Sequence, residues 1–205
     1  MSKKNRIDLG KKKIKIEFTE KVMTSFGGLS LISAFFEKIG LSALLNSAFP
    51  IVETSNRKIP LYNRLLAFML TVYTGGERFA HMLYFGNAEA IKTIFSIDKL
   101  PKAATTITRL FRKIKTLELA NIVSKKLWEF TDKMLDWNKL DSDWLDFDSS
   151  VIVRYGNQEG ADKGYNPKKP GRNSHNPIFA FLNKQRCVVN VWNRCGSTKS
   201  SNNIV

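Results

Sequence analysis

Metal-binding and disulfide-forming side chains are scarce in this sequence of 205 residues, which has two cysteines and two histidines. Cys187 and Cys195 are too few for a disulfide framework, and their spacing does not fit a zinc knuckle. His81 and His175 lie far apart, without the partners that a metal cluster needs, so both are interpreted as ordinary residues. The composition therefore favours neither a disulfide-rich secreted domain nor a zinc protein, and it fits a reducing compartment.

Long hydrophobic runs are also lacking. The uncharged stretch 22–36 follows a lysine-rich leader, as in a signal peptide, but the leader contains acidic residues and the stretch contains Gly27-Gly28. A second uncharged stretch, 65–76, is shorter than the about 20 residues that span a bilayer. We therefore expect a cytoplasmic protein with no membrane partner.

Acidic residues are the third shortage, since 18 Asp and Glu stand against 33 Lys and Arg, for a net charge of +15. Residues 1–21 contain eight cations and three acids, residues 99–126 eight and one, and residues 151–205 nine and two. Residues 127–150 reverse the balance, with seven acids and two lysines. Positive charge in blocks favours a polyanionic partner, either nucleic acid or an anionic membrane surface. The alternative is that the excess only keeps the protein soluble.

The hydrophobic content of 43% is enough for a folded core, and the length fits one large domain or two small ones. After a basic arm (1–13) and a short strand around 14–18, apolar periodicity predicts a series of helices. The predicted helices cover 29–39, 41–49, 60–74, 77–85, 87–95, 105–117 and 120–135. Pro60 opens the third of these helices and Gly75-Gly76 closes it. Because apolar residues cover most of its circumference, we expect this helix to be buried.

The helix predicted at 105–117 combines an apolar stripe with cationic faces, and Thr105 or Thr106 can cap it. Its stripe comprises Ile107, Leu110, Phe111, Ile114 and Leu117. Its cations are Arg109, Arg112, Lys113 and Lys115. A short helix, a turn and a basic amphipathic helix are the components of a helix-turn-helix, so we predict that these cations contact DNA. The alternative is an ordinary solvated helix face.

From residue 139 the apolar period changes to two, which predicts a strand over 142–155. Leu145 and Phe147 then point into a core, and Asp146 and Asp148 share the opposite face, about 6.6 Å apart along the strand. Carboxylates in mid-strand are costly to bury unpaired, so this pair predicts a site for a divalent cation such as Mg²⁺. The alternative is that Asp148 forms a turn or cap with the two serines that follow.

Three segments around these aspartates resemble the start of the catalytic domain in one group of bacterial insertion-sequence transposases. They are Asp148-Ser149-Ser150, Tyr155-Gly156-Asn157-Gln158-Glu159-Gly160 and Gly164-Tyr165-Asn166-Pro167-Lys168-Lys169-Pro170-Gly171-Arg172. The resemblance covers roughly the last third of the chain with specific motifs, and the helical part more loosely. It implies a DDE enzyme with a ribonuclease-H-like fold, in which two Asp and one Glu hold two metal ions for DNA cleavage and strand transfer.

Residue by residue, the resemblance implies that Asp148 is the family's first Asp, a catalytic residue and metal ligand. Asp146 is then a supporting residue or the alternative ligand. The connection rich in Gly and Pro is expected to contact the DNA backbone through Lys163, Lys168, Lys169 and Arg172. The alternative for these cations is a solvated hairpin connection. Gln158 and Glu159 match the family without a derived role, and Glu159 is not the Glu of its triad.

The family's second Asp and its Glu lie downstream of Val205, and no acidic residue follows Asp162 in this sequence. We therefore expect a C-terminally truncated α+β chain. Residues 1–138 would form a helical DNA-binding and dimerisation region, and residues 139–205 the start of an incomplete ribonuclease-H-like domain. Its first antiparallel strands are predicted at 142–155, 178–182 and 187–193. Without covering helices, Phe179 and Phe181 would be exposed.

The predicted function is that of a transposase that binds double-stranded DNA at the element's terminal repeats and at the target, in the cytoplasm and associated with the nucleoid. We expect a homo-oligomer, or a hetero-oligomer with full-length transposase. Two Mg²⁺ ions are expected only in a complete catalytic domain, so this chain alone should be inactive. One alternative is a non-catalytic remnant that binds element ends or inhibits intact transposase. Another, an RNA-binding protein, has no RNA-binding motif to support it.

Overall fold

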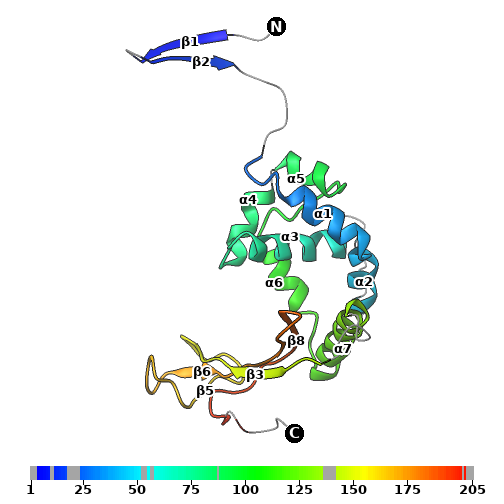
Figure 1. The fold of residues 1–205 in the computed structure, drawn as a ribbon, viewed down its shortest axis with the longest axis vertical. Coiled ribbons are helices and arrows are strands. Elements are labelled where there is room, and N and C mark those ends of the chain that lie inside the picture. Colours follow the sequence, from blue (N-terminus) through cyan, green and yellow to red (C-terminus); the bar gives the residue numbers. More distant parts are fainter. Residues whose placement is uncertain are drawn as a thin grey trace. The chain divides into compact units, whose positions relative to one another are not determined.

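The computed structural model describes residues 4–9, 12–17, 24–51, 55, 58–86, 88–135, 142–199 and 201. Contacts divide the chain into two compact units, which we call the N-terminal unit (Met1–Val123) and the C-terminal unit (Ser124–Val205). Each is described by itself (Figure 1). The domain boundary predicted between residues 138 and 139 lies outside the described residues and stays a prediction.

Helices and small antiparallel sheets occur together in the described residues, which confirms the predicted α+β class. The α-helices are α1 (Leu29–Lys38), α2 (Leu41–Ala48), α3 (Leu61–Tyr73), α4 (Leu83–Gly86), α5 (Glu89–Ile94), α6 (Thr105–Phe111) and α7 (Leu117–Met134), with a 3-10 helix, η1 (Phe79–Met82), before α4. The strands are β1 (Lys4–Leu9), β2 (Lys12–Glu17), β3 (Leu145–Ser149), β4 (Ile152–Val153), β5 (Asp162–Lys163), β6 (Asn173–His175), β7 (Ile178–Leu182) and β8 (Cys187–Trp192).

The first two strands form an antiparallel hairpin in which Ile7 is opposite Ile14. The sequence predicted a strand around 14–18, and β2 occupies most of that range. Residues 4–9 were assigned to a basic arm, whereas the structure places them in β1. Their own alternation of apolar and polar residues, with Ile7 and Leu9 two positions apart, is typical of a strand and was overlooked.

Glycine and proline set the helix boundaries of the N-terminal unit where the sequence predicted them. Gly40 adopts a left-handed conformation, with φ of 66°, between α1 and α2. Pro60 precedes the first turn of α3, and Gly75, with φ of 82°, follows its end. No described helix is by itself both long and apolar enough to cross a membrane; α1 and α2 reach that length and hydropathy only as a pair bent by 67°.

Helix α3 is the centre of the N-terminal core. Leu66 and Leu70 are completely buried, and η1, α2 and α6 contact this helix. The prediction of a buried helix holds for most of its length, but Val72 and Tyr73 at its C-terminal end are exposed. Other fully buried side chains around it come from the neighbouring helices: Met82, Phe85, Ile91, Ile107 and Leu110.

The helix predicted at 105–117 is shorter in the structure, because α6 ends at Phe111 and α7 begins at Leu117. The backbone N–H groups of Lys113 and Ile114 donate to carbonyls three residues back, which tightens the end of α6. The Oγ1 of Thr116 then accepts a hydrogen bond from the N–H of Leu119, at 3.2 Å. Thr116 thus caps a new helix and ends the old one.

Two details predicted for this helix are therefore wrong. The residue before α6 is Ala104, and no side chain caps its N-terminus, so neither Thr105 nor Thr106 is the cap. Ile107 and Leu110 are buried as the stripe predicted, but Leu117 is exposed at the start of α7.

The strands of the C-terminal unit form two small antiparallel sheets, ordered β3-β7-β8 and β4-β6-β5. The first sheet joins the three segments predicted to pair with one another, which confirms that antiparallel arrangement. The second sheet was not predicted, because its strands are only two or three residues long and lie in a segment interpreted as an irregular connection. The predicted strand 142–155 breaks after Ser149, and the N–H of Ser150 donates to the carbonyl of Pro177 at 3.0 Å.

Burial in the first sheet differs from the prediction. Leu145 and Phe147 were expected in the core but are 50% and 48% exposed, because β3 pairs only with β7 among the described strands and Phe147 is opposite the small Ala180. Phe179 and Phe181 were expected to be exposed, yet both are half-buried and their rings lie 6.0 Å apart between centroids.

Candidate carboxylate site and nucleic-acid interface

The register of β3 places its two aspartates on one face of the sheet. Asp146 is opposite Phe181 and Asp148 is opposite Phe179 in the central strand β7. Directly opposed residues of an antiparallel pair share a face, so the two carboxylates lie beside the two phenylalanine rings. Both aspartates are exposed.

The two carboxylates differ in their partners. The Oδ2 of Asp146 accepts a hydrogen bond from the side-chain amide of Asn183 at 3.3 Å. Within the described part of the chain, no hydrogen bond or ion pair engages the carboxylate of Asp148. Because Asp148 lies inside β3 and its carboxylate bonds no described backbone group, the alternative in which it caps a turn is wrong. Its oxygens are therefore open to a ligand from solvent.

A third aspartate, which the sequence analysis did not single out, holds β3 in place. The Oδ1 of Asp143 accepts from the backbone N–H groups of Trp144 and Lys184, each at 2.8 Å. The N–H of Lys184, followed by other backbone donors, lowers the pKa of Asp143 below its usual value. This carboxylate thus ties the start of β3 to the turn between β7 and β8. An aspartate just before a strand, where its side chain bonds the following N–H, was the local signal.

The described residues contain no group of three or more His, Cys, Asp or Glu side chains that could hold a metal ion. Asp146 and Asp148 are the two carboxylates that β3 offers on one face. Two-metal chemistry on DNA requires more ligands than this pair. The described residues thus do not fit a complete two-metal site.

The cations predicted in the Gly/Pro-rich connection lie around an ordered turn. The Oδ1 of the buried Asn166 accepts from the N–H of Lys169 at 2.9 Å, and the N–H of Arg172 donates to the carbonyl of Lys169 at 3.3 Å. Lys163 lies in β5. Lys163, Lys168, Lys169 and Arg172 are all exposed. Hydrogen bonds therefore order this connection, and its cations lie on the surface.

Two of these cations converge on a tyrosine. The Nζ of Lys169 donates a hydrogen bond to the hydroxyl of Tyr155 and lies 4.9 Å from the ring centroid. The Cζ of Arg172 lies 5.8 Å from the same centroid. The hydrogen bond from Lys169, then its charge, lowers the pKa of Tyr155. Tyr155 belongs to the motif that resembled the family, but the sequence did not predict this convergence.

A buried histidine links three segments of the C-terminal unit through hydrogen bonds. The Nε of Arg154 donates to Nδ1 of His175 at 2.8 Å, so the ring proton is on Nε2, which donates to the carbonyl of Glu159 at 2.9 Å. His175, interpreted from the sequence as ordinary, thus joins β4, β6 and the segment before β5. The carbonyl of Glu159 therefore has a structural role as the acceptor for His175. The carbonyl of Gln158 accepts a hydrogen bond from the N–H of Ala161 at 3.0 Å.

The first glycine of the segment 164–172 is required by packing. A Cβ at Gly164 would lie 1.7 Å from the carbonyl oxygen of Gly196. A Cβ at Gly196 would in turn lie 2.3 Å from the carbonyl oxygen of Asp162. The two backbones therefore approach each other as closely as only glycine allows.

The cations predicted on the basic helix of the N-terminal unit occupy its end and the turn that follows. Arg109 lies on α6, Arg112 follows its last residue, and Lys113 and Lys115 lie in the turn before α7. All four are exposed. Ten residues separate the end of α5 from the start of α6, whereas the turn of a helix-turn-helix has about three or four. We call these four cations the α6 cluster. The helices α5 and α6 do not form the short-turn pair of a helix-turn-helix.

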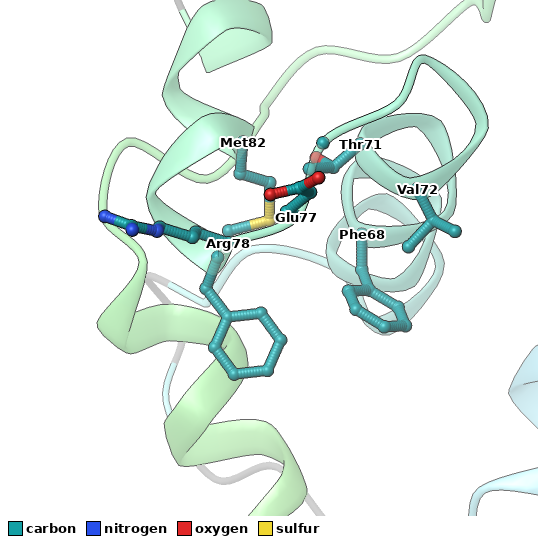
Figure 2. A pocket seen from close by; sticks show the side chains of 8 residues that line it. Phe68, Thr71, Val72, Glu77, Arg78 and Met82 are labelled. Carbon is teal, nitrogen blue, oxygen red and sulfur yellow. The ribbon is translucent and has the colours of Figure 1, made fainter. Parts of the chain in front are cut away.

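An open hollow of about 260 Å³, which the sequence did not predict, lies between α3 and η1. Figure 2 shows Phe68 and Val72 of α3 along one wall and Met82 along the other, with Arg78 pointing away. The ring of Phe68 lies 5.8 Å from that of Phe79 and 5.4 Å from that of Phe111, between centroids. The hollow is mainly apolar and contains no arrangement of side chains suited to catalysis.

Comparison with known proteins identifies the class. The family model described as Transposase DDE domain group 1 matches residues 7–205. The chain therefore belongs to this family of DDE transposases, as the motifs predicted. No curated protein and no solved structure matches it. DDE transposase domains generally use divalent metal ions, and family membership implies a DNA substrate.

Proposed function

We propose that this chain binds the ends of an insertion sequence as duplex DNA and contributes Asp148 as a metal-binding carboxylate of the transposition site, with Mg²⁺ as the metal. Family membership over residues 7–205 supports the reaction class. The observation that singles out Asp148 is its exposed carboxylate in β3, which no described residue engages. Asp146, bonded to Asn183, has the supporting role. The sheet β3-β7-β8 is proposed as the beginning of a ribonuclease-H-like sheet.

Two cationic surfaces are proposed to hold the DNA. One consists of Arg109, Arg112, Lys113 and Lys115 in the N-terminal unit. The other consists of Lys163, Lys168, Lys169 and Arg172 in the C-terminal unit. Phosphate contacts from such side chains position a protein on the duplex without reading its sequence. The net charge of +15 supports strong attraction to DNA at low salt. Assembly with a second copy or with full-length transposase, and association with the nucleoid, are proposed with this function.

Duplex binding is tested with the purified chain and a labelled duplex taken from the terminal repeats that flank its gene. A shuffled duplex of equal length and composition is the control. We expect affinity to fall steeply with salt, with a slope of about −0.9 for each phosphate that the chain neutralises, and to be higher for the terminal repeat. Absence of binding to either duplex at low salt would refute the proposal.

These 205 residues are proposed not to transpose DNA by themselves. The described residues offer no group of three metal-binding side chains, which two-metal chemistry on DNA requires. The same observation favours a second candidate function, that of a non-catalytic chain that binds element ends or inhibits an intact transposase. A strand-transfer assay with the purified chain, Mg²⁺ and element ends separates the two. We expect no joined product, and joined product with turnover would contradict this.

A further inference from the structure

Tyr155 presents an exposed aromatic ring beside two cations. It follows β4 and is 64% exposed. Because the Nζ of Lys169 bonds the hydroxyl and lies 4.9 Å from the ring centroid, this ammonium lies beside the hydroxyl end of the ring. The guanidinium of Arg172 lies over the ring, with Cζ 5.8 Å from the ring centroid. A tyrosine whose role is packing would instead be largely buried.

The surroundings hold the ring and the cations in this arrangement. The N–H of Arg154 donates to the carbonyl of Asn173 at 2.8 Å, which anchors the residue before Tyr155 to the second sheet. The turn closed by Asn166 anchors Lys169. Among the described residues, neither Lys169 nor Arg172 forms an ion pair with a carboxylate. Their positive charge is therefore available to a ligand.

We propose that Tyr155, Lys169 and Arg172 form a binding site for an unpaired nucleotide, in which the tyrosine ring stacks on the base and the two cations hold the adjacent phosphate. Aromatic faces next to cations are the surfaces on which proteins bind single strands, since every base has a π face. Bases inside a duplex are stacked on each other, so this ring face matches a base that has left the duplex. The inference rests on the proposed function, because it assumes that this surface contacts DNA.

The test compares a fluorescently labelled oligothymidylate with a mixed-sequence duplex of equal length, by fluorescence anisotropy of the full chain at one salt concentration. Tyr155→Ala should weaken binding of the single strand by about 5- to 150-fold, the range measured for loss of one stacked base. Its effect on the duplex should stay within about 2-fold, because phosphate contacts by the cations remain. Tyr155→Phe should keep the single-strand affinity, because stacking does not need the hydroxyl.

Tyr73→Ala is the matched control, because Tyr73 is also 64% exposed and lies at the end of α3. We expect it to leave both affinities unchanged. Equal losses for single strand and duplex in Tyr155→Ala would overturn the stacking role. So would a loss in Tyr155→Phe as large as in Tyr155→Ala, or unchanged single-strand affinity in Tyr155→Ala. If the unsubstituted chain binds neither oligonucleotide, the proposed function itself fails.

Discussion

The two units of this chain bury different kinds of side chain. In the N-terminal unit, Leu66, Leu70 and Ile107 are fully buried, and most other buried residues there are also apolar. Buried polar side chains are concentrated in the C-terminal unit: Asn166, Ser174, His175, Asn176 and Arg194. Two of them, Asn176 and Arg194, are joined by two hydrogen bonds. The backbone N–H of Asn176 donates to the carbonyl of Arg194, and the Nε of Arg194 donates to the carbonyl of Asn176.

The comparison shows which surfaces each kind of core supports. Apolar burial has no direction, so the N-terminal unit needs only the right periodicity and volume. Hydrogen bonds have direction, so the bonds of His175 to Arg154 and to the carbonyl of Glu159 fix how β4, β6 and the segment before β5 are joined. These bonds support the segments beside β4 and β6, where Tyr155, Lys169 and Arg172 converge. The strands there are too short to hold this arrangement alone.

The largest effect is expected from truncation of the apolar core. Leu66→Ala removes a side chain with no exposed surface and leaves a cavity, which should cost about 2–5 kcal/mol. Amide hydrogen exchange of α3 measures the loss of protection. The control, Leu31→Ala on the exposed face of α1, should change stability by no more than about 0.5 kcal/mol. Equal effects of the two substitutions would show that α3 is not the core of this unit.

Next in size is the close backbone approach in the C-terminal unit. Gly164→Ala would place a methyl group 1.7 Å from the carbonyl of Gly196, so the backbone must shift, at a cost of about 1–3 kcal/mol. Exchange of the amides in β5 and β6 reports the change. Gly27→Ala is the control, because a Cβ there meets no atom within 4 Å. Unchanged exchange in Gly164→Ala would mean that these backbones do not approach so closely.

Sequence reasoning succeeded where the determinants were local. The boundaries of α1 and α3 follow from Gly40, Pro60 and Gly75, and the three strands of the first sheet follow from apolar alternation. It failed at the end of α6, because the cap formed by Thr116 outweighed a continuous amphipathic pattern.

The second sheet and the role of His175 depend on hydrogen bonds between residues far apart in the chain, which periodicity does not reveal. The candidate site divides in the same way. Asp148 is predicted as a site residue from its motif and from the alternation of β3, both of which are local. Asp143 and the convergence on Tyr155 require Lys184 and Lys169, which lie 41 and 14 residues away. Such partners become visible only in the folded chain.

The α6 cluster should affect DNA binding and not folding, because its side chains are exposed. Replacing Arg109, Arg112 and Lys113 with Ala should weaken duplex binding and reduce the salt slope by about 0.9 for each phosphate that the variant no longer neutralises. A control that replaces Lys38, Arg78 and Lys133, also exposed, removes the same charge elsewhere. Identical affinity and slope in the two triple variants would exclude the cluster from the interface.

The smallest effect concerns Asp143 and pH. Because backbone donors lower its pKa in the folded state, its contribution to stability is present above the pKa of the unfolded state and is lost as pH falls through the folded pKa. Exchange protection of β3 and β7 should therefore fall below about pH 4 in the unsubstituted chain. Asp143→Asn, which keeps an acceptor but no titrating charge, should flatten this dependence. An unaltered pH profile would contradict the role given to Asp143.

The most direct test of the central claim is the position of a bound divalent ion. Mn²⁺ can replace Mg²⁺ at carboxylate sites, and its paramagnetism broadens nearby amide resonances even when binding is weak. Titration of the labelled chain should broaden the amides of Phe147, Asp148 and the opposed Phe179 first. Asp148→Asn should abolish this broadening, and Asp146→Asn should leave most of it. Broadening that survives Asp148→Asn and disappears in Asp146→Asn would contradict the account, because the metal would then belong to Asp146.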